Sequence, residues 1–203
     1  MVTVKFILWF FVGLLCVVNV WLLIMNVEYL FCAFIRHQPP YVVSHKRLRR
    51  AVVKELQKNY PNARRVCEIG AGYGTLARQI SKDAGRDVLA LENMPFSALV
   101  CWVRGFIWPG RYKTKWCDAI DFLKNTDQHF DAAVAYLGPM FISRLMDCAG
   151  RFDVLLSLDF ELPGMRATRV IDGIGGYTIY NRKKYPHRVY IYEFKNKKQR
   201  EKK

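Results

Sequence analysis

The sequence predicts an α/β domain with a mostly parallel sheet and an antiparallel closing strand, preceded by one N-terminal transmembrane helix. Three observations predict this fold class. Residues 6–25 carry no charge, short apolar runs alternate with helix-like stretches from Arg65 onward, and closely spaced glycines follow the first of those runs. Alternation of this kind is typical of parallel strands joined by helices that cover both faces of a sheet.

The N-terminal segment has the length and composition of a membrane-spanning helix. From Phe6 to Met25 the chain carries no charge, and Asn19 is the one strongly polar side chain. At about 1.5 Å per residue, such a helix matches the ~30 Å hydrocarbon core of a bilayer. A core helix of this length would normally show a polar face, and a cleaved signal peptide has a shorter apolar run followed by a small-residue cleavage site. We therefore expect residues 1–35 to be a retained membrane anchor.

The charges that flank this segment predict its orientation. Lys5 lies on one side, and several basic residues lie on the other: Arg36, Lys46, Arg47, Arg49 and Arg50. The positive-inside rule places the C-terminal portion on the cytoplasmic side, or on the matrix side of a mitochondrial membrane. Much of the formal net charge of +15 lies in residues 45–50 and 195–203. Basic clusters near a bilayer are attracted to anionic lipid, so we expect membrane contact rather than nucleic acid, and a disordered basic tail over 196–203.

Cysteines and histidines show no spacing that is typical of a metal site or of a disulfide framework. The six cysteines form no CxxC pair, and the four histidines are scattered: His37, His45, His129 and His187. Isolated cysteines of this kind are typical of buried, reduced thiols. We therefore expect no metal.

A linker and an amphipathic helix, residues 36–62, are expected to lead into the domain. Ser44 is a favourable N-cap residue, and Leu48, Val52 and Leu56 share one face of the helix that follows. The domain itself is expected over residues 63–195. Its predicted strands are 66–69, 87–91, 112–117, 130–136 and 152–158, its helices are 75–84, 95–104, 119–124 and 140–148, and its closing strands are 166–171, 177–181 and 188–194.

The glycine-rich turn after the first predicted strand has the pattern E-x-G-x-G-x-G, with Gly70, Gly72 and Gly74 in alternate positions. In an open α/β sheet, ligands bind beyond the carboxyl ends of the strands, where this turn lies. A phosphate-binding Walker loop is excluded because no GK[ST] sequence follows the glycines. A dinucleotide fingerprint would need a glycine in place of Thr75. A plain tight turn is the alternative for the glycines alone.

Three acidic residues stand at the ends of the first three predicted strands. Glu68 precedes the glycines, Glu92 ends the second strand, and Asp118 follows the third. Glu92 or Asp118 could instead cap the helix that each precedes. Three acids together suit a ligand that carries positive charge and no pyrophosphate.

At these residues the chain resembles the class I S-adenosylmethionine (SAM) dependent methyltransferases, over residues 43–194. The resemblance implies a Rossmann-like sheet and the cofactor S-adenosyl-L-methionine. It implies that Glu68 helps to hold the amino acid part of the cofactor, that Glu92 takes the ribose hydroxyls, and that Asp118 faces the adenine. The other residues implied in cofactor binding are Gly70, Ala71, Gly72, Tyr73, Gly74, Asn93 and Ala119.

A narrower resemblance combines the N-terminal helix, the helix before the domain, the sequence LENMPFSALVCWVRG after the second strand, and a direct step from the fifth strand to the closing strands. This combination is similar to the membrane-anchored lysine methyltransferases, which include the mitochondrial enzymes acting on the adenine nucleotide translocase and on the ATP synthase c-subunit, with prokaryotic relatives. Two features depart from that pattern: Tyr73, where many relatives have a small acidic or polar residue, and the sequence AYLGPMF at the end of the fourth strand.

We therefore expect a monomeric, membrane-anchored enzyme that N-methylates a lysine of a membrane or membrane-associated protein. The acceptor should approach the end of the fourth strand, where the candidate wall consists of Tyr136, Leu137, Gly138 and Pro139. The [DN]PP[YFW] motif of enzymes that methylate amino groups of DNA and glutamine is replaced here by LGPM. The alternatives are a lipid headgroup amine, RNA, and a non-catalytic scaffold with the same fold.

Overall fold

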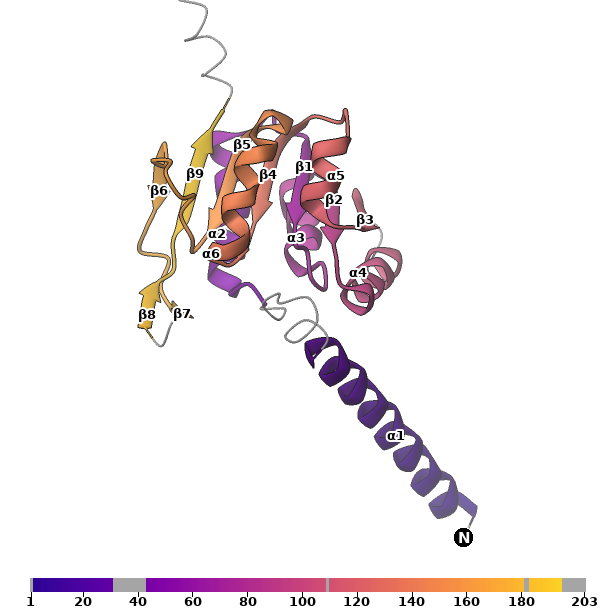
Figure 1. The fold of residues 1–203 in the computed structure, drawn as a ribbon. Helices are drawn as coiled ribbons and strands as arrows, with labels where there is room; N and C mark the ends of the chain where they lie inside the picture. Colours follow the sequence, from indigo (N-terminus) through magenta and orange to yellow (C-terminus); the bar gives the residue numbers. More distant parts are fainter. Residues whose placement is uncertain (1, 31–42, 109, 181–182, 195–203) are drawn as a thin grey trace, which may run out of the picture. The chain divides into compact units, whose positions relative to one another are not determined.

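The computed structural model describes residues 2–30, 43–108, 110–180 and 183–194 (Figure 1). The chain divides into two compact units, Met1–Tyr41 and Val42–Lys203. Most of the expected linker, residues 36–42, and the expected basic tail, residues 196–203, lie outside the described residues.

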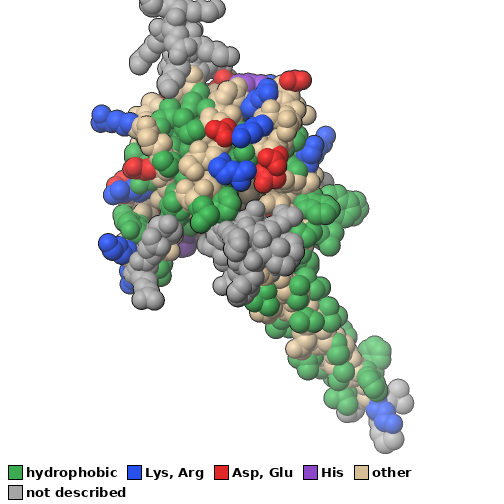
Figure 2. All heavy atoms as spheres, in the orientation of Figure 1, with side chains coloured by type: hydrophobic (Ala, Val, Ile, Leu, Met, Phe, Trp, Pro, Cys, Tyr) green, Lys and Arg blue, Asp and Glu red, His purple; other side chains and the backbone are tan. Residues whose placement is uncertain are grey.

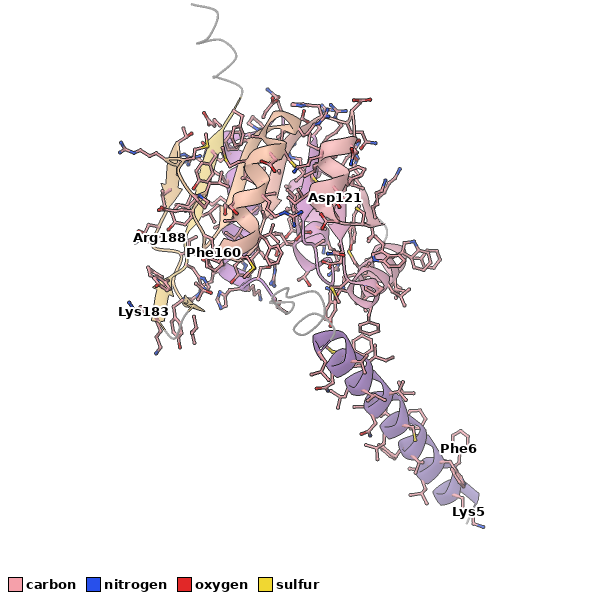
Figure 3. All side chains as sticks on the ribbon, in the orientation of Figure 1. Lys5, Phe6, Asp121, Phe160, Lys183 and Arg188 are labelled. Carbon is pink, nitrogen blue, oxygen red and sulfur yellow. The ribbon has the colours of Figure 1, made fainter. Side chains whose placement is uncertain are left out.

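The described residues of the first unit form one long helix, α1, which spans Val2–Leu30. Its segment Lys5–Val27 has a mean hydropathy of 2.6, and 0% of its most apolar window is buried. Figure 2 shows hydrophobic side chains along the length of the helix, and Figure 3 labels Phe6 near its start. The amide of Asn19 donates a hydrogen bond to the carbonyl oxygen of Leu15 at 2.8 Å, so this polar side chain is satisfied within the helix. By length and composition, α1 is able to cross a membrane.

The second unit is built on a seven-stranded sheet with the order β3-β2-β1-β4-β5-β9-β6. The strands from β3 to β5 in this order are parallel, and β9 runs antiparallel to both β5 and β6. The predicted mostly parallel sheet with an antiparallel closing strand is therefore confirmed. The strands are β1 (Arg65–Ile69), β2 (Asp87–Glu92), β3 (Tyr112–Trp116), β4 (Phe130–Ala135), β5 (Phe152–Leu158), β6 (Arg169–Ile171) and β9 (Val189–Glu193).

The strand order reverses between β1 and β4, which are neighbours in the sheet. Ile69 at the end of β1 is paired with Ala135 at the end of β4, so the chain segments that follow these strands leave the sheet side by side. Ligands of open α/β sheets bind in the crevice at such a reversal. The glycine turn and the predicted acceptor wall both begin there.

Helices cover both faces of the sheet (Figure 1). The hydrophobic core accordingly forms two clusters, and β1 contributes to both because successive side chains of a strand point to opposite faces: Val66 lies in one cluster and Cys67 in the other. The first cluster includes residues of α2 (Lys46–Asn59), α3 (Thr75–Ala84) and α4 (Pro95–Ile107). The second includes residues of α5 (Ala119–Asn125), α6 (Pro139–Ile142) and the 3₁₀-helix η2 (Ser143–Arg151).

The segment after β6 differs from the expectation. β7 (Tyr177–Tyr180) pairs with β8 (Lys183–Pro186) in a separate two-stranded antiparallel sheet. The sequence predicted residues 177–181 as a closing strand of the main sheet, and it predicted no strand over 183–186. Because β9 pairs with β5 on one side and with β6 on the other, a further strand could join this side of the sheet only at the outer edge of β6, which is three residues long. The residues of β7 pair with β8 instead.

The start of α2 and the predicted helix 140–148 also need correction. The N-cap residue of α2 is His45, whose Nδ1 accepts a hydrogen bond from the Arg47 backbone N–H at 3.3 Å, whereas Ser44 precedes the cap and is buried. The helix 140–148 is divided into α6 and η2. Its buried residues Leu145 and Cys148 are three apart, the repeat of a 3₁₀ turn, so both reach the core.

The cysteines are partly as expected. Those in the described residues are free thiols, and Cys67, Cys101 and Cys148 are buried. Cys16 is exposed on α1 and Cys117 is half-buried, so the expectation that the thiols are buried was wrong for these two.

Candidate active site

The turn between β1 and α3 has a backbone that requires glycine at three positions. Gly70, Gly72 and Gly74 have φ angles of 72°, 55° and 69°, in the left-handed region. The backbone N–H groups of Gly70 and Ala71 both donate to the carbonyl oxygen of Leu91 at 3.0 Å, which holds the turn against the end of β2. Glycine adopts these angles without the strain that a Cβ would add. The sequence pattern therefore reflects the path of the backbone.

Two of these glycines also leave room for neighbouring side chains. A Cβ at Gly70 would lie 2.8 Å from Leu137 Cδ2. A Cβ at Gly74 would lie 1.8 Å from the Tyr112 hydroxyl oxygen and 2.7 Å from Cys101 Sγ. Gly70 thus brings the turn against the predicted acceptor wall. Gly74 packs against β3 and α4, a role that the spacing of the glycines does not reveal.

Glu92 connects the turn to the end of β2. It is 7% exposed, and its carboxylate accepts hydrogen bonds from the backbone N–H groups of Gly72 at 2.6 Å, Asn93 at 2.9 Å and Met94 at 2.8 Å. A carboxylate has about four acceptor positions, so these bonds use most of them. The carbonyl oxygen of Asn93 in turn accepts from the indole N–H of Trp116 at 2.9 Å. The bond to the ribose hydroxyls stays a prediction.

Glu68 is a buried acid with an unpaired oxygen. It is 5% exposed, and its Oε2 accepts no hydrogen bond from any residue in the described ranges. Burial raises the pKa of this carboxyl well above its usual value, while the Ala77 backbone N–H lowers it, the Glu92 charge raises it and the Arg49 charge lowers it. A buried acceptor without a partner costs about 1–3 kcal/mol. A cationic ligand group next to Oε2 would remove that cost.

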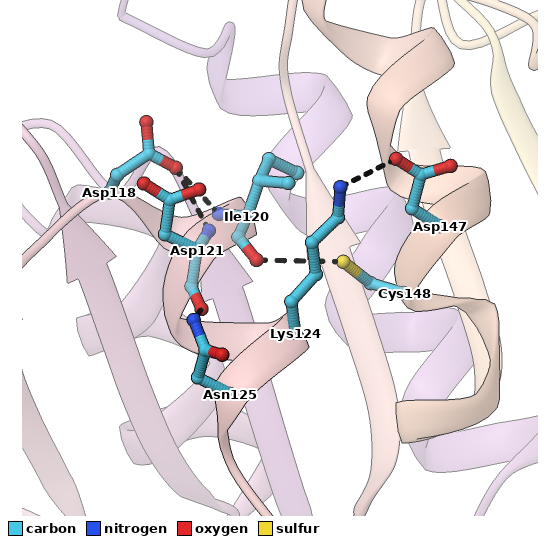
Figure 4. Close-up of polar contacts among 7 residues, drawn as sticks. All are labelled: Asp118, Ile120, Asp121, Lys124, Asn125, Asp147 and Cys148. Atoms are coloured by element: carbon cyan, nitrogen blue, oxygen red, sulfur yellow. Dashed lines mark hydrogen bonds and ion pairs between the residues drawn. The ribbon is translucent and has the colours of Figure 1, made fainter.

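Asp118 caps the helix that follows β3. Its Oδ1 accepts hydrogen bonds from the backbone N–H groups of Ile120 at 2.9 Å and Asp121 at 3.2 Å (Figure 4). The same view shows α5 held to η2 by the ion pair between Lys124 and Asp147, at 2.7 Å. The helix-capping alternative from the sequence is therefore realised, and the contact of Asp118 with adenine stays a prediction.

The predicted cofactor residues come from three neighbouring strand ends. They follow β1, β2 and β3, which are adjacent in the sheet. Ala71 is buried, and the half-buried members of the set are Tyr73, Asn93, Asp118 and Ala119. The fold brings the set to one edge of the sheet, as the resemblance implies.

The predicted acceptor wall follows β4 and leads into α6. Gly138 is the N-cap residue of α6, and Pro139 is its first residue, a position that proline favours. The ring of Tyr136 stacks on that of Phe160, which follows β5 and is labelled in Figure 3; the ring centroids are 6.4 Å apart. Burial raises the pKa of the Tyr136 hydroxyl to about 12. Tyr136 therefore presents a neutral, partly enclosed aromatic side chain near the glycine turn.

Beside this wall lies a buried pair that the sequence analysis missed. His187 Nδ1 lies 2.9 Å from Asp159 Oδ2, and the backbone N–H of Arg188 donates to Asp159 Oδ1 at 3.1 Å. The Asp159 side chain is fully buried, and its φ of 64° is the one positive value among the non-glycine residues of the described part. The His187 ring stacks on that of His45, with centroids 5.2 Å apart, and the Asp159 charge acts on the Tyr136 hydroxyl.

This pair joins the end of β5, the start of β9 and the first turn of α2 to the acceptor wall. Asp159 and His187 are 28 residues apart, so no short motif reveals their contact. The one available signal is that Asp159 directly follows the fifth strand, at the same edge of the sheet as the other acids.

A scan against protein-family models and a search of curated proteins gave no match. Solved structures do match. An RNA methyltransferase from Salinibacter ruber, in complex with S-adenosyl-L-homocysteine, has a TM-score of 0.56 and 15% identity over 75% of this chain and 93% of that one. A SAM-dependent O-methyltransferase from Thermotoga maritima has a TM-score of 0.56 and 12% identity over 75% of this chain and 67% of that one. TrmK from M. capricolum, also in complex with S-adenosyl-homocysteine, has a TM-score of 0.55 and 11% identity over 75% of this chain and 69% of that one.

Sequence identities this low, combined with these TM-scores, show the fold of the chain but not its substrate. The observed sheet of this chain is mostly parallel, and its glycine turn lies at the point where the strand order reverses. The chain therefore has the class I SAM-dependent methyltransferase fold.

Proposed function

We propose that this chain is a membrane-anchored, SAM-dependent methyltransferase that N-methylates a lysine of a membrane or membrane-associated protein. The observation that supports it most is the buried, unpaired Oε2 of Glu68 next to three left-handed glycines at the end of β1. A glycine turn alone is a common way to join a strand to a helix. A buried acid with spare acceptor capacity beside it favours a cationic ligand.

S-adenosyl-L-methionine fits these residues by its charges. It carries an ammonium and a sulfonium, a ribose diol and an adenine, and it supplies a methyl group for in-line displacement when bound. Glu68 would hold the ammonium, directly or through the turn. Glu92, which the backbone N–H of Gly72 holds against the turn, would take the ribose hydroxyls, and Asp118 with Ala119 would face the adenine.

The acceptor side of the site suits an amine. Aromatic faces such as those of Tyr136 and Phe160 attract a cation before it loses its proton. An enclosed, poorly solvated position lowers the pKa of a lysine ammonium because it disfavours the charged form. Leu137 contacts the turn at Gly70, so the wall and the cofactor residues adjoin. Asp159 and His187 are positioning residues in this proposal, because they hold the segment against which Tyr136 packs.

The apolar helix α1 supports the choice of a membrane substrate. In this proposal α1 crosses the membrane once, and the charges on either side put the domain on the cytoplasmic or matrix side. Tethering raises the effective concentration of partners that share the same membrane. A lysine of a membrane protein is therefore favoured over a soluble substrate, and one copy of the chain holds every proposed site residue, so a monomer suffices.

The test is transfer of label from tritiated-methyl SAM. The purified full-length chain is incubated with this SAM and with membranes from cells that lack the gene. We expect label in a protein band and, after hydrolysis, in methylated lysine. Label that appears only in extracted lipid or RNA would contradict the proposal that the substrate is a lysine. The absence of label from every fraction would contradict the proposal that the chain is an enzyme and would favour a non-catalytic scaffold. Glu68→Gln is the matched variant, and at a SAM concentration near the Kd of the unmodified chain it should strongly reduce the label in every fraction.

A further inference from the structure

Helix α4 turns its large apolar side chains away from the protein. Its buried residues are the small ones, Ser97, Ala98 and Cys101. The large apolar side chains on and just after the helix are 38–77% exposed: Leu99, Trp102, Val103, Phe106, Ile107 and Trp108. We call these six residues the α4 face. Soluble monomers seldom expose a contiguous apolar patch of this kind unless something binds it.

The α4 face lies at one edge of the sheet. Helix α4 connects β2 to β3, and β3 is the outermost strand on that side. In Figure 2, hydrophobic side chains gather on the side of the domain where Figure 1 places α4. The candidate active site lies at the carboxyl ends of β1, β2, β3 and β4.

A basic pocket adjoins the α4 face. It has a volume of about 350 Å³ and is lined by residues of α3, the end of α4 and the start of β3: Arg78, Ser81, Lys82, Trp108, Gly110, Arg111 and Tyr112. The guanidinium of Arg78 lies over the Trp108 ring, 4.8 Å from its centroid. Trp108 thus belongs both to the pocket and to the α4 face.

The pocket contains a buried donor without a partner. Ser81 is 6% exposed, and its Oγ makes no hydrogen bond to any residue in the described ranges. A Cβ at Gly110 would lie 2.9 Å from that oxygen, so glycine keeps the approach to Ser81 open. Two cations, Arg78 and Lys82, lie beside it, and a third, Arg111, forms an ion pair with Asp87 at 2.6 Å. A hydroxyl with guanidinium and ammonium groups is a donor set that suits a phosphate oxygen.

We propose that this pocket binds the phosphate of an anionic phospholipid while the α4 face lies in the interface of the same bilayer. Tryptophan is enriched at membrane interfaces because its ring is apolar and its N–H is polar. Anionic lipid complements both the pocket and the formal net charge of +15. The proposal relies on the proposed function only for the membrane anchor: residues 31–42 between α1 and the domain span at most about 43 Å, so the domain stays within reach of the surface.

Quenching by brominated lipid tests the position of the α4 face. The full-length chain is reconstituted in vesicles of phosphatidylcholine and phosphatidylglycerol that carry bromine near the headgroup end of the acyl chains. All tryptophans except Trp102 are replaced by Phe. We expect strong quenching of Trp102 emission. In the matched variant, all five native tryptophans are replaced and Tyr185→Trp places the reporter in the separate two-stranded sheet, where we expect no quenching.

Charge removal tests the pocket. The substitutions are made in the chain whose one tryptophan is Trp102. Arg78→Ala combined with Lys82→Ala should reduce the ratio of membrane-docked to undocked domain roughly 30-fold, because two cations near an anionic surface are lost. Quenching should then fall to its level in vesicles of phosphatidylcholine alone. Lys183→Ala with Lys184→Ala removes the same charge from β8 and should leave the quenching unchanged.

Three results would overturn the proposal. The first is that Trp102 shows no quenching in any vesicle, and the second is that its quenching is the same with and without the substitutions of Arg78 and Lys82. The third result is binding of inorganic phosphate by a chain whose Trp102 is not quenched by the vesicles. If the solvent exposure of Trp102 in detergent decreased as the protein concentration increased, the α4 face would be a surface for self-association of the chain instead. Hydrogen exchange of the unmodified chain is the second measurement, and the α4 amides should exchange more slowly in phosphatidylglycerol vesicles than in phosphatidylcholine. None of these readouts needs SAM or a methyl acceptor, so they fail independently of the proposed activity.

Discussion

Glu68 and Asp159 are two buried acids near the carboxyl edge of one sheet, and their surroundings differ. Both carboxylate oxygens of Asp159 have partners, in His187 Nδ1 and the Arg188 backbone N–H. Glu68 keeps one oxygen without a partner among the described residues, beside the glycine turn. A buried acid that is satisfied within the protein stabilises the fold, whereas an unsatisfied one is costly and marks a place where a ligand compensates. The comparison separates a structural acid from a candidate binding acid.

The largest expected effect concerns the glycine turn next to Glu68. Gly74→Ala should lower the free energy of unfolding by about 2–5 kcal/mol, because it adds a left-handed side chain and an overlap with Tyr112. Gly85 has a similar φ, 66°, but open space around its Cβ position. Gly85→Ala should therefore cost only about 1–2 kcal/mol. Denaturant unfolding of the full-length variants measures both, and equal losses would mean that Gly74 is not constrained by packing.

The next effect compares the two acids by the same change, carboxylate to amide. Asp159→Asn replaces an acceptor of the bond from His187 and should lower the free energy of unfolding by about 1–3 kcal/mol. Glu68→Gln removes an acid whose burial is unfavourable, so it should leave the stability of the ligand-free chain unchanged or raise it. Unfolding curves of the two variants decide this. The reverse order of stabilities would contradict the assignment of roles.

The smallest effect is in the pH dependence. The pKa of Glu68 is raised in the folded chain, so the folded state keeps this proton to a higher pH than the unfolded state does. The ligand-free protein therefore loses stability as the pH rises from 4.5, the ordinary value, toward the raised folded pKa. Glu68→Gln does not titrate, so its stability relative to the unmodified chain should increase across that window. If the free energies of unfolding of the two chains changed with pH in the same way, the pKa of Glu68 would not be raised in the folded chain.

Sequence patterns predicted the parts of the fold that depend on local periodicity. The alternation of strands and helices and the glycine turn were predicted because each is set by residues close in the chain, and the closing strands were predicted because they follow the fifth strand directly. The contact between Asp159 and His187 was not, because it depends on where β9 joins the sheet. The sheet formed by β7 and β8 was missed for a related reason, since local periodicity indicates a strand but does not indicate which strand it pairs with.

The α4 face shows a further limit of sequence patterns. The helix is apolar nearly all round, so periodicity does not reveal which side faces the core. In the structure the small residues Ala98 and Cys101 face inward, where Tyr112 and the glycine turn leave little room, and Trp102 and Phe106 point outward. The helix thus exposes its largest side chains, which the sequence pattern did not predict.

Calorimetric titration of the full-length chain with SAM tests the central claim, that the glycine turn and Glu68 form a cofactor site. We expect the unmodified chain to bind SAM, and Asp159→Asn to bind it with the same affinity because Asp159 is a structural acid. Glu68→Gln should weaken binding roughly 10- to 100-fold, the effect of losing one charged hydrogen bond. Equal affinity of Glu68→Gln and the unmodified chain, or no binding by either, would contradict the claim.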